Sequence, residues 1–229
     1  MTPAITSSSA WLRSVVQLFA SQGVDPASLF AEVGLDPAKL KLPHERFATE
    51  DLNRLWEIAV RTSGQLNLGL DRQLAKKHLK FEIATQPMWS GRTLLDGLEG
   101  LSRYLLLIGD SAGFTLRMAR GDAWLELLHG TDPRLPRQRF EFGLLGLLML
   151  CEKVTSHKLR PLAVEFVFPE PADFHAYRMA FHCPLRFGQP VNRLRLGRED
   201  LALPIVRPTD SVVVLHERVI ESRLERFAN

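Results

Sequence analysis

The stretch PLAVEFVFPEPADFHAYRMAFHCPLRFGQPVNRLRLG, residues 161–197, decides the fold because it changes element type several times within a short length of chain. Its first part, LAVEFVF at 162–168, is rich in β-branched and aromatic residues, which is typical of a buried strand. Asp173 is expected to cap a short helix that runs to Ala180. The segments LRFG and NRLRLG lie on either side of a Gln189-Pro190 turn and predict two more short strands. This region is therefore expected to combine sheet and helix.

Two histidines, a tyrosine and a cysteine lie in the same stretch and raise the question of a reactive site. His175 and His182 are seven residues apart, so on one helix they would share a face two turns apart, too far to bind one metal directly. The Cys183-Pro184 step is expected beyond the helix end, because a residue before proline disfavours helical geometry. The pattern favours a helix that packs Phe174, Tyr177, Phe181 and His182 on the sheet, with no metal site and no catalytic residue. A metal or thiol catalytic site is the less favoured alternative. The roles of the two histidines and of Cys183 stay open.

The first third of the chain is predicted to be helical because helix-start and helix-stop signals recur at short intervals. Ser9 is expected to cap a helix with one apolar stripe, which Gly23 closes. Asp25-Pro26 and Asp36-Pro37 each place a capping aspartate before a proline at the first helical position. Thr49 is expected to cap the next helix, which Gly64 ends. Residues 1–75 are therefore expected to form a helical part.

Residues 76–208 are expected to form an α+β part. Thr93 and Asp96 form a capping-box-like start for an apolar helix. GFTLRMARGDAWLELLHG, residues 113–130, has two alternating runs around Gly121 and predicts a β-hairpin. A strongly apolar helix is expected at about 138–155. The predicted fold class is α+β, with a helical N-terminal part followed by a small antiparallel sheet flanked by helices.

The composition excludes several classes of protein. Hydrophobic residues make up 45% and charged residues 24% of the 229, as is ordinary for a globular protein. A net charge of +3 is too small to indicate nucleic-acid binding by itself. The longest apolar run, 142–151, is too short for a membrane-spanning helix, which needs about 20 residues. Cys151 and Cys183 are far apart and no signal peptide is visible, so reduced thiols and a cytoplasmic location are expected, with a single disulfide as the alternative.

The sequence contains no motif that indicates an enzyme. It has no G-x-x-x-x-G-K-[ST] phosphate loop, no G-x-S-x-G nucleophile motif and no H-E-x-x-H zinc helix. The helices between Trp11 and Leu42 superficially resemble a helix-turn-helix, but the segment SLFAEVG at 28–34 carries Glu32 and no basic side chain. Helices that pack on a core are therefore favoured here. A small-molecule enzyme on an α+β scaffold and a ligand-free interaction module remain as alternatives.

Four blocks follow one another along almost the whole chain: QGVDPASLFAEVGLDPAKL, PHERFATEDLNRLWEIA, TLLDGLEGLSRYLLLIGD, and the segment from LRPLAVEFVF to DLALPI. In this order they resemble the N-terminal effector-sensing domain of AraC-type transcription regulators, in the arabinose-binding-like branch typified by ornithine-utilisation regulators. Two positions depart from the family's usual pattern. Phe168 stands where a histidine is common, and His182-Cys183 stand where glycine and a small or variable residue are usual.

The resemblance implies a function. A domain of this family would bind a small effector, associate as a homodimer and contact DNA only through a C-terminal helix-turn-helix domain that is absent from these residues. It implies no enzymatic activity, no cofactor and no membrane contact. A last helix predicted over 209–229 is the candidate for dimer contact or signal transmission, through Val213, Ile220, Leu224 and Phe227. Packing of this helix on its own domain is the alternative.

An effector pocket is expected where aromatic side chains meet a few polar groups. The candidates are Phe81, Trp89, Tyr104, Trp124 and Phe166, with Arg103 or Arg117 available to meet a carboxylate. Each of them could instead belong to the core or the surface. Trp89 is the most distinctive, because Pro87 and Gly91 place it in a predicted loop. The identity of the effector does not follow from these residues.

Overall fold

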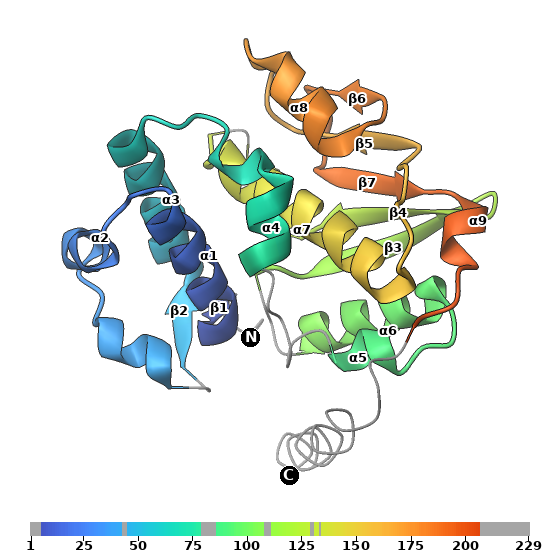
Figure 1. Ribbon diagram of the computed structural model, residues 1–229, viewed down its shortest axis with the longest axis horizontal. Helices are drawn as coiled ribbons and strands as arrows, with labels where there is room; N and C mark the ends of the chain where they lie inside the picture. The colour runs from blue at the N-terminus through green and yellow to red at the C-terminus, as the bar shows by residue number, and fades with distance from the viewer. Residues whose placement is uncertain are drawn as a thin grey trace.

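The computed structural model describes residues 6–42, 45–78, 86–107, 111–128, 131–132 and 134–206. The helical part consists of β1 (Thr6–Ser8), α1 (Ser9–Ser21), α2 (Pro26–Val33), the 3-10 helix η1 (Pro37–Lys41), β2 (Arg46–Ala48), α3 (Thr49–Ser63), the 3-10 helix η2 (Leu68–Leu70) and α4 (Arg72–His78). The sheet part consists of α5 (Gln86–Trp89), α6 (Leu94–Leu107), β3 (Phe114–Ala119), β4 (Asp122–Leu127), α7 (Arg137–Thr155), β5 (Ala163–Glu165), α8 (Phe174–Phe181), β6 (Leu185–Arg186), β7 (Arg193–Leu196) and α9 (Arg198–Leu201). Figure 1 shows α1, α2 and α3 on one side and the larger sheet on the other, with α4 and α7 between them. The predicted α+β class is confirmed.

Local signals account for most helix ends. Asp25 accepts the backbone N–H groups of Ala27 and Ser28 at the start of α2. Gly34 closes this helix in the left-handed conformation, with φ 78°. Thr93 and Asp96 exchange the two hydrogen bonds of a capping box.

Two helix starts differ from the prediction by one residue. Ser8, not Ser9, caps α1, because its hydroxyl accepts the N–H of Trp11. α3 begins with Thr49 after Ala48, which makes no side-chain cap.

The antiparallel pair β1–β2 was not expected in the helical part. The boundary predicted at 75/76 falls within α4, and this division of the chain stays a prediction.

The larger sheet has the strand order β3-β4-β7-β5-β6. The predicted hairpin forms β3 and β4, with its turn at Arg120 and Gly121. An antiparallel sheet was expected, but the sheet is mixed because β5 and β6 pair in parallel. The reason is that α8 connects these two strands and returns the chain to the same end of the sheet. β5 is also shorter than the predicted strand at 162–168.

The core joins both parts of the chain. α7 is buried along most of its length, as its apolar sequence predicts, and it contacts α3, α4, α6 and β4. Trp56 of α3 and Phe142 of α7 pack ring against ring with their centroids 5.8 Å apart. Within the described part of the chain, no helix is long and apolar enough to cross a membrane.

The short helix α8 packs on the sheet as predicted. Tyr177 and Phe181 are fully buried, and both rings contact the ring of Phe166. His182 ends the helix with φ 52° and is exposed, so it does not pack on the sheet as was expected, and His175 is exposed too. No group of three or more histidine, cysteine, aspartate or glutamate side chains suited to a metal ion occurs among the residues the structure describes.

Candidate functional site

A cavity of about 70 Å³ lies between α1, α6, the β3–β4 hairpin and α7. Its wall is almost entirely apolar and includes Leu101 and Leu105 of α6 and Phe114 of β3. α7 contributes more of the wall than any other element, through a stripe of residues at helical spacing: Arg139, Phe140, Gly143, Gly146, Leu147 and Leu150. The cavity is partly open to solvent.

Two glycines make room for the cavity in the middle of α7. Gly143 and Gly146 both line it, three residues apart on one face of the helix. Glycine within a helix costs about 1 kcal/mol relative to alanine. A methyl group added at Gly143 would come within 3.3 Å of Leu127 Cδ1, so this glycine also lets the side chain of Leu127 approach the helix. The helix thus gives up stability at the two positions that face the cavity.

Arg139 supplies the charge in the cavity wall. Only 4% of this residue is exposed to solvent. Its Nη1 donates to Asn53 Oδ1 of α3 at 2.6 Å, and its Nη2 donates to the backbone oxygen of Ser111 at 3.4 Å. Ser111 in turn shares a 2.6 Å hydroxyl–hydroxyl hydrogen bond with Ser7 of β1. The polar side of the cavity therefore connects the helical part to the sheet part.

A second hollow of about 280 Å³ lies beside η2 and is lined by Gln22, Gln65, Leu66, Asn67, Leu68 and Asp71. It is larger than the first, but nearly all of its residues are exposed or half-buried. Small-molecule sites are usually concave and mostly apolar, with few polar groups. The apolar cavity beside α7 is therefore the better candidate.

The structure places the predicted pocket residues in several separate environments. Trp89 is the last residue of the short helix α5, so the predicted loop is wrong, and its side chain is half-buried against the core. Tyr104 is half-buried on α6. Arg103 of α6 is exposed. Phe166 is fully buried in the aromatic cluster under α8.

Of the remaining candidate residues, two lie on the sheet and the others lie outside the residues that the structure describes. Arg117 and Trp124 lie side by side on the sheet as cross-strand partners. Phe81 and the predicted last helix, with Val213, Ile220, Leu224 and Phe227, lie outside the described residues. None of the described candidates lines the apolar cavity, and their role in effector binding stays a prediction.

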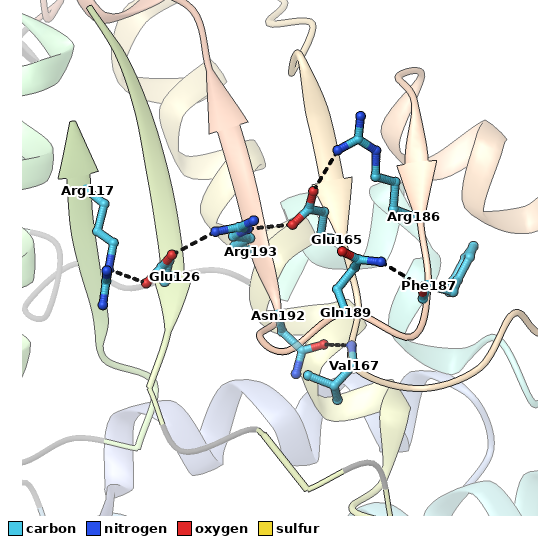
Figure 2. Close-up of polar contacts among 9 residues, drawn as sticks. All are labelled: Arg117, Glu126, Glu165, Val167, Arg186, Phe187, Gln189, Asn192 and Arg193. Carbon is cyan, nitrogen blue, oxygen red and sulfur yellow. Dashed lines mark hydrogen bonds and ion pairs between the residues drawn. The ribbon is translucent and has the colours of Figure 1, made fainter. Parts of the chain in front are cut away.

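Arg117 belongs to a row of alternating charges across the sheet, here called the charge ladder (Figure 2). It consists of Arg117, Glu126, Arg193, Glu165 and Arg186, one from each strand. Glu126 is held by Arg117 at 2.7 Å and by Arg193 at 3.1 Å. Glu165, only 1% exposed, is held by Arg193 at 2.5 Å and by Arg186 at 3.2 Å.

Trp124 lies beneath this ladder. The guanidinium carbon of Arg193 is 4.0 Å from the centroid of its ring, and that of Arg195 is 5.5 Å away. These cation–π contacts and the paired carboxylates explain why arginines and a tryptophan share this face of the sheet. The arrangement covers the sheet with paired polar groups, so Arg117 and Trp124 have structural partners there.

A buried carboxyl group lies on α7 away from the cavity. The hydroxyl of Tyr177 donates to Glu141 Oε1, and Arg137 Nε is 3.6 Å from the same oxygen. Burial raises the pKa of Glu141 to about 7, although both neighbours favour its charged form. Burial, followed by the charge of Glu141, raises the pKa of Tyr177 above its ordinary value. This pair links α7 to α8.

Sequence reasoning missed the cavity residues Arg139, Gly143 and Gly146. The glycines were visible as the pair in FGLLGLLML, three residues apart within a helix whose other residues are apolar. A glycine inside a helical pattern costs stability and is a signal to look for a packing or functional reason. Arg139 precedes this run and could be assigned to the wall only when α3 and the segment before β3 were placed beside it.

Comparison with known protein families identifies the chain. Residues 23–205 match the family described as the arabinose-binding domain at the N-terminus of AraC transcription regulators. The chain belongs to this family. The resemblance drawn from the four sequence blocks is thereby confirmed, and the AraC-type domain is a ligand-sensing domain of a kind found in transcription regulators.

The fold of this AraC-type domain is similar to that of a solved regulator. The crystal structure of the transcriptional regulator CdpR from Pseudomonas aeruginosa matches with a TM-score of 0.50 and 19% sequence identity. The match covers 88% of this chain and 64% of the CdpR chain, so the AraC-type domain spans less than two thirds of that regulator. At this identity the similarity shows the fold alone. No curated protein matches the chain.

Proposed function

We propose that this AraC-type domain senses a small effector bound in the apolar cavity between α6, the β3–β4 hairpin and α7. The observation that carries the proposal is the composition of the wall, in which two helix-interior glycines leave space beside a buried arginine. A protein interior normally closes such space, because packing stabilises it. A cavity kept open at a cost in helix propensity is better explained by a ligand.

α7 also provides a route from the cavity to the end of the described chain. Gly143 and Gly146 lie at the cavity, and the backbone oxygen of Val154, near the end of the same helix, accepts the N–H of Val206 at 2.8 Å. Ile205 N–H donates to Arg92 O at 3.1 Å, which ties the same segment to the start of α6. A ligand that shifts α7 would therefore act on the segment that leads out of the domain.

In the proposed regulator this segment leads to a C-terminal helix-turn-helix domain that binds DNA, and the protein acts as a homodimer in the cytoplasm. The effector would control DNA binding only if it binds one arrangement of α7 more tightly than another, with a typical coupling of about 1–3 kcal/mol. The family supports this role, and the helix predicted over 209–229 remains the candidate for dimer contact or transmission.

Ligand binding in the cavity is tested by closing it. A panel of small metabolites is screened for saturable thermal stabilisation of the wild-type domain, as expected for a ligand that binds only the folded state. The variant Gly146→Leu fills the cavity, and Lys153→Leu adds the same side chain to an exposed position of the same helix. We expect stabilisation to disappear in Gly146→Leu and to persist in Lys153→Leu, with an unchanged circular dichroism spectrum in both. Stabilisation that survives in both variants would place the ligand elsewhere.

A further inference from the structure

We infer that the effector of the cavity is a small uncharged molecule, held there by apolar contacts and not by an ion pair. The inference rests on the proposed function, because it assumes that the cavity is the effector site. It adds the chemical class of the ligand, which follows from the contacts that the polar groups of the wall already make, from the apolar remainder of the wall and from the size of the cavity.

Arg139, the charged residue among the described residues of the wall, is already held by the protein. Its Nη1 donates to Asn53 Oδ1 and its Nη2 to the backbone oxygen of Ser111. Its guanidinium carbon also lies 5.5 Å from the centroid of the Phe140 ring, which is part of the same wall. The residue has a further interaction within the protein. A buried guanidinium with partners on several sides is stabilised without a ligand, so the wall does not call for an anionic effector.

The other polar groups of the wall also bond to protein. The hydroxyl of Ser111 bonds to that of Ser7 at 2.6 Å, and the N–H of Ser111 donates to Thr6 O at 2.9 Å. On the hairpin side, Leu128 N–H donates to Gly113 O at 2.9 Å. A ligand that left water for this wall would find few partners for its own polar groups, and unpaired buried polar groups lower the affinity. A charged group would lose most, because its burial without a partner costs more than that of a neutral polar group.

The remainder of the wall is aliphatic and aromatic. α6 contributes Leu101 and Leu105, α7 contributes Leu147 and Leu150, and β3 contributes Phe114. Each of these five residues is at most 8% exposed to solvent. An apolar group among them is removed from water on most sides, and the free energy gained increases with the apolar area that is buried. Apolar contact is therefore the main interaction that this wall offers to a ligand.

The size of the cavity limits the apolar part of the ligand. A dry cavity of about 150 Å³ holds a benzene molecule. The cavity beside α7, at about 70 Å³, has roughly half of this space. It fits a short linear or branched aliphatic group, and a longer molecule would extend through the open side.

The test compares three probes of similar shape, 1-chloropropane, propanoate and propylammonium, by methyl NMR titration of the wild-type protein at neutral pH. We expect 1-chloropropane to shift the methyl resonances of Leu101, Leu147 and Leu150, with a dissociation constant of about 1 mM for so small a ligand. Propanoate and propylammonium should bind at least about ten-fold more weakly, because each would bury a charge without a new partner. Gly146→Leu should abolish the binding of 1-chloropropane, and Lys153→Leu, exposed on the same helix, should leave it unchanged.

The outcomes separate this inference from the proposed function. If a charged probe shifts the same leucines as tightly as 1-chloropropane, the cavity is a ligand site but the uncharged class is wrong. If 1-chloropropane binds Gly146→Leu as tightly as wild type, or if it does not bind wild type, the inference fails. Because the three probes are compared on wild-type protein and the leucine resonances report where they bind, the comparison remains decisive even if Gly146→Leu does not fold.

The metabolite panel gives a second test of the same class. Any metabolite whose thermal stabilisation is lost in Gly146→Leu and kept in Lys153→Leu should be uncharged and largely apolar. A charged metabolite with this behaviour would overturn the inference while supporting the proposed function.

Discussion

Replacing Glu141 by glutamine should remove a pH dependence that this buried carboxyl group gives to the stability of the domain. Glu141 is fully buried in α7, where the Tyr177 hydroxyl donates to it and Arg137 lies 3.6 Å away. Burial raises its pKa from 4.5 to about 7. The folded protein therefore holds a proton that the unfolded chain releases near pH 4.5.

The sign of the effect follows from this difference in pKa. A carboxyl group with a raised pKa in the folded state adds stability below the unfolded pKa, and that stability is lost as the pH rises through 7. The difference between 4.5 and about 7 corresponds to about 3 kcal/mol. Between pH 5 and pH 8 the wild type should therefore lose about 2.5 kcal/mol through this group alone.

The assay is urea unfolding of wild type and Glu141→Gln at pH 5 and pH 8. Glutamine keeps the size of the side chain and an oxygen that accepts from Tyr177, but it does not titrate. The wild type should lose about 2.5 kcal/mol more than the variant between the two pH values. Glu57→Gln, an exposed change on α3, serves as the control and should keep the wild-type pH dependence. An equal pH dependence of wild type and Glu141→Gln would refute the reasoning.

Three further predictions concern the sheet, the thiols and the hairpin. Glu165→Gln removes the buried charge that two arginines hold, and it should lower the free energy of unfolding in urea by about 2 kcal/mol, whereas Glu32→Gln, in an exposed ion pair, should lower it by less than about 1 kcal/mol. Similar losses in the two variants would show that burial does not strengthen the charge ladder. Burial raises the pKa of Cys151 above its ordinary value and that of Cys183 to about 12, so both thiols should react slowly with a thiol reagent at pH 8 in the folded protein and quickly in urea. Rapid labelling of Cys151 in the folded protein would contradict its burial. Gly121 has φ 95°, so Gly121→Ala should lower the stability by about 1–2 kcal/mol, and an unchanged unfolding midpoint would argue against the turn geometry.

Elements with a local cause were predictable from the sequence. Asp25-Pro26 starts α2 because its carboxylate caps backbone groups two and three residues away. The hairpin around Gly121 and the buried helix α7 follow in the same way from alternation and from continuous apolarity. In each case the residues that cause the element lie within it or beside it, so no knowledge of the rest of the chain is needed.

Pairings between distant segments were not predictable in this way. The β1–β2 pair joins residues 6–8 to residues 46–48, and each strand is too short for its sequence pattern to predict a strand. The parallel pairing of β5 with β6 depends on how α8 packs, which is decided by the aromatic cluster around Phe166. The charge ladder depends on the register of five strands, since a shift of one residue would turn Glu165 to the other face.

By itself, the sequence determined the helix starts, the hairpin, the buried helix and, through the order of its four blocks, the AraC-type family. Only the tertiary structure decided where the candidate effector cavity lies. The cavity exists because α1, α6, the hairpin and α7 meet around two glycines, and Arg139 enters its wall because Asn53 and Ser111 hold it there. Helix signals act over a few residues, whereas a cavity is a space left between segments that are distant in the chain, so its position depends on how those segments pack.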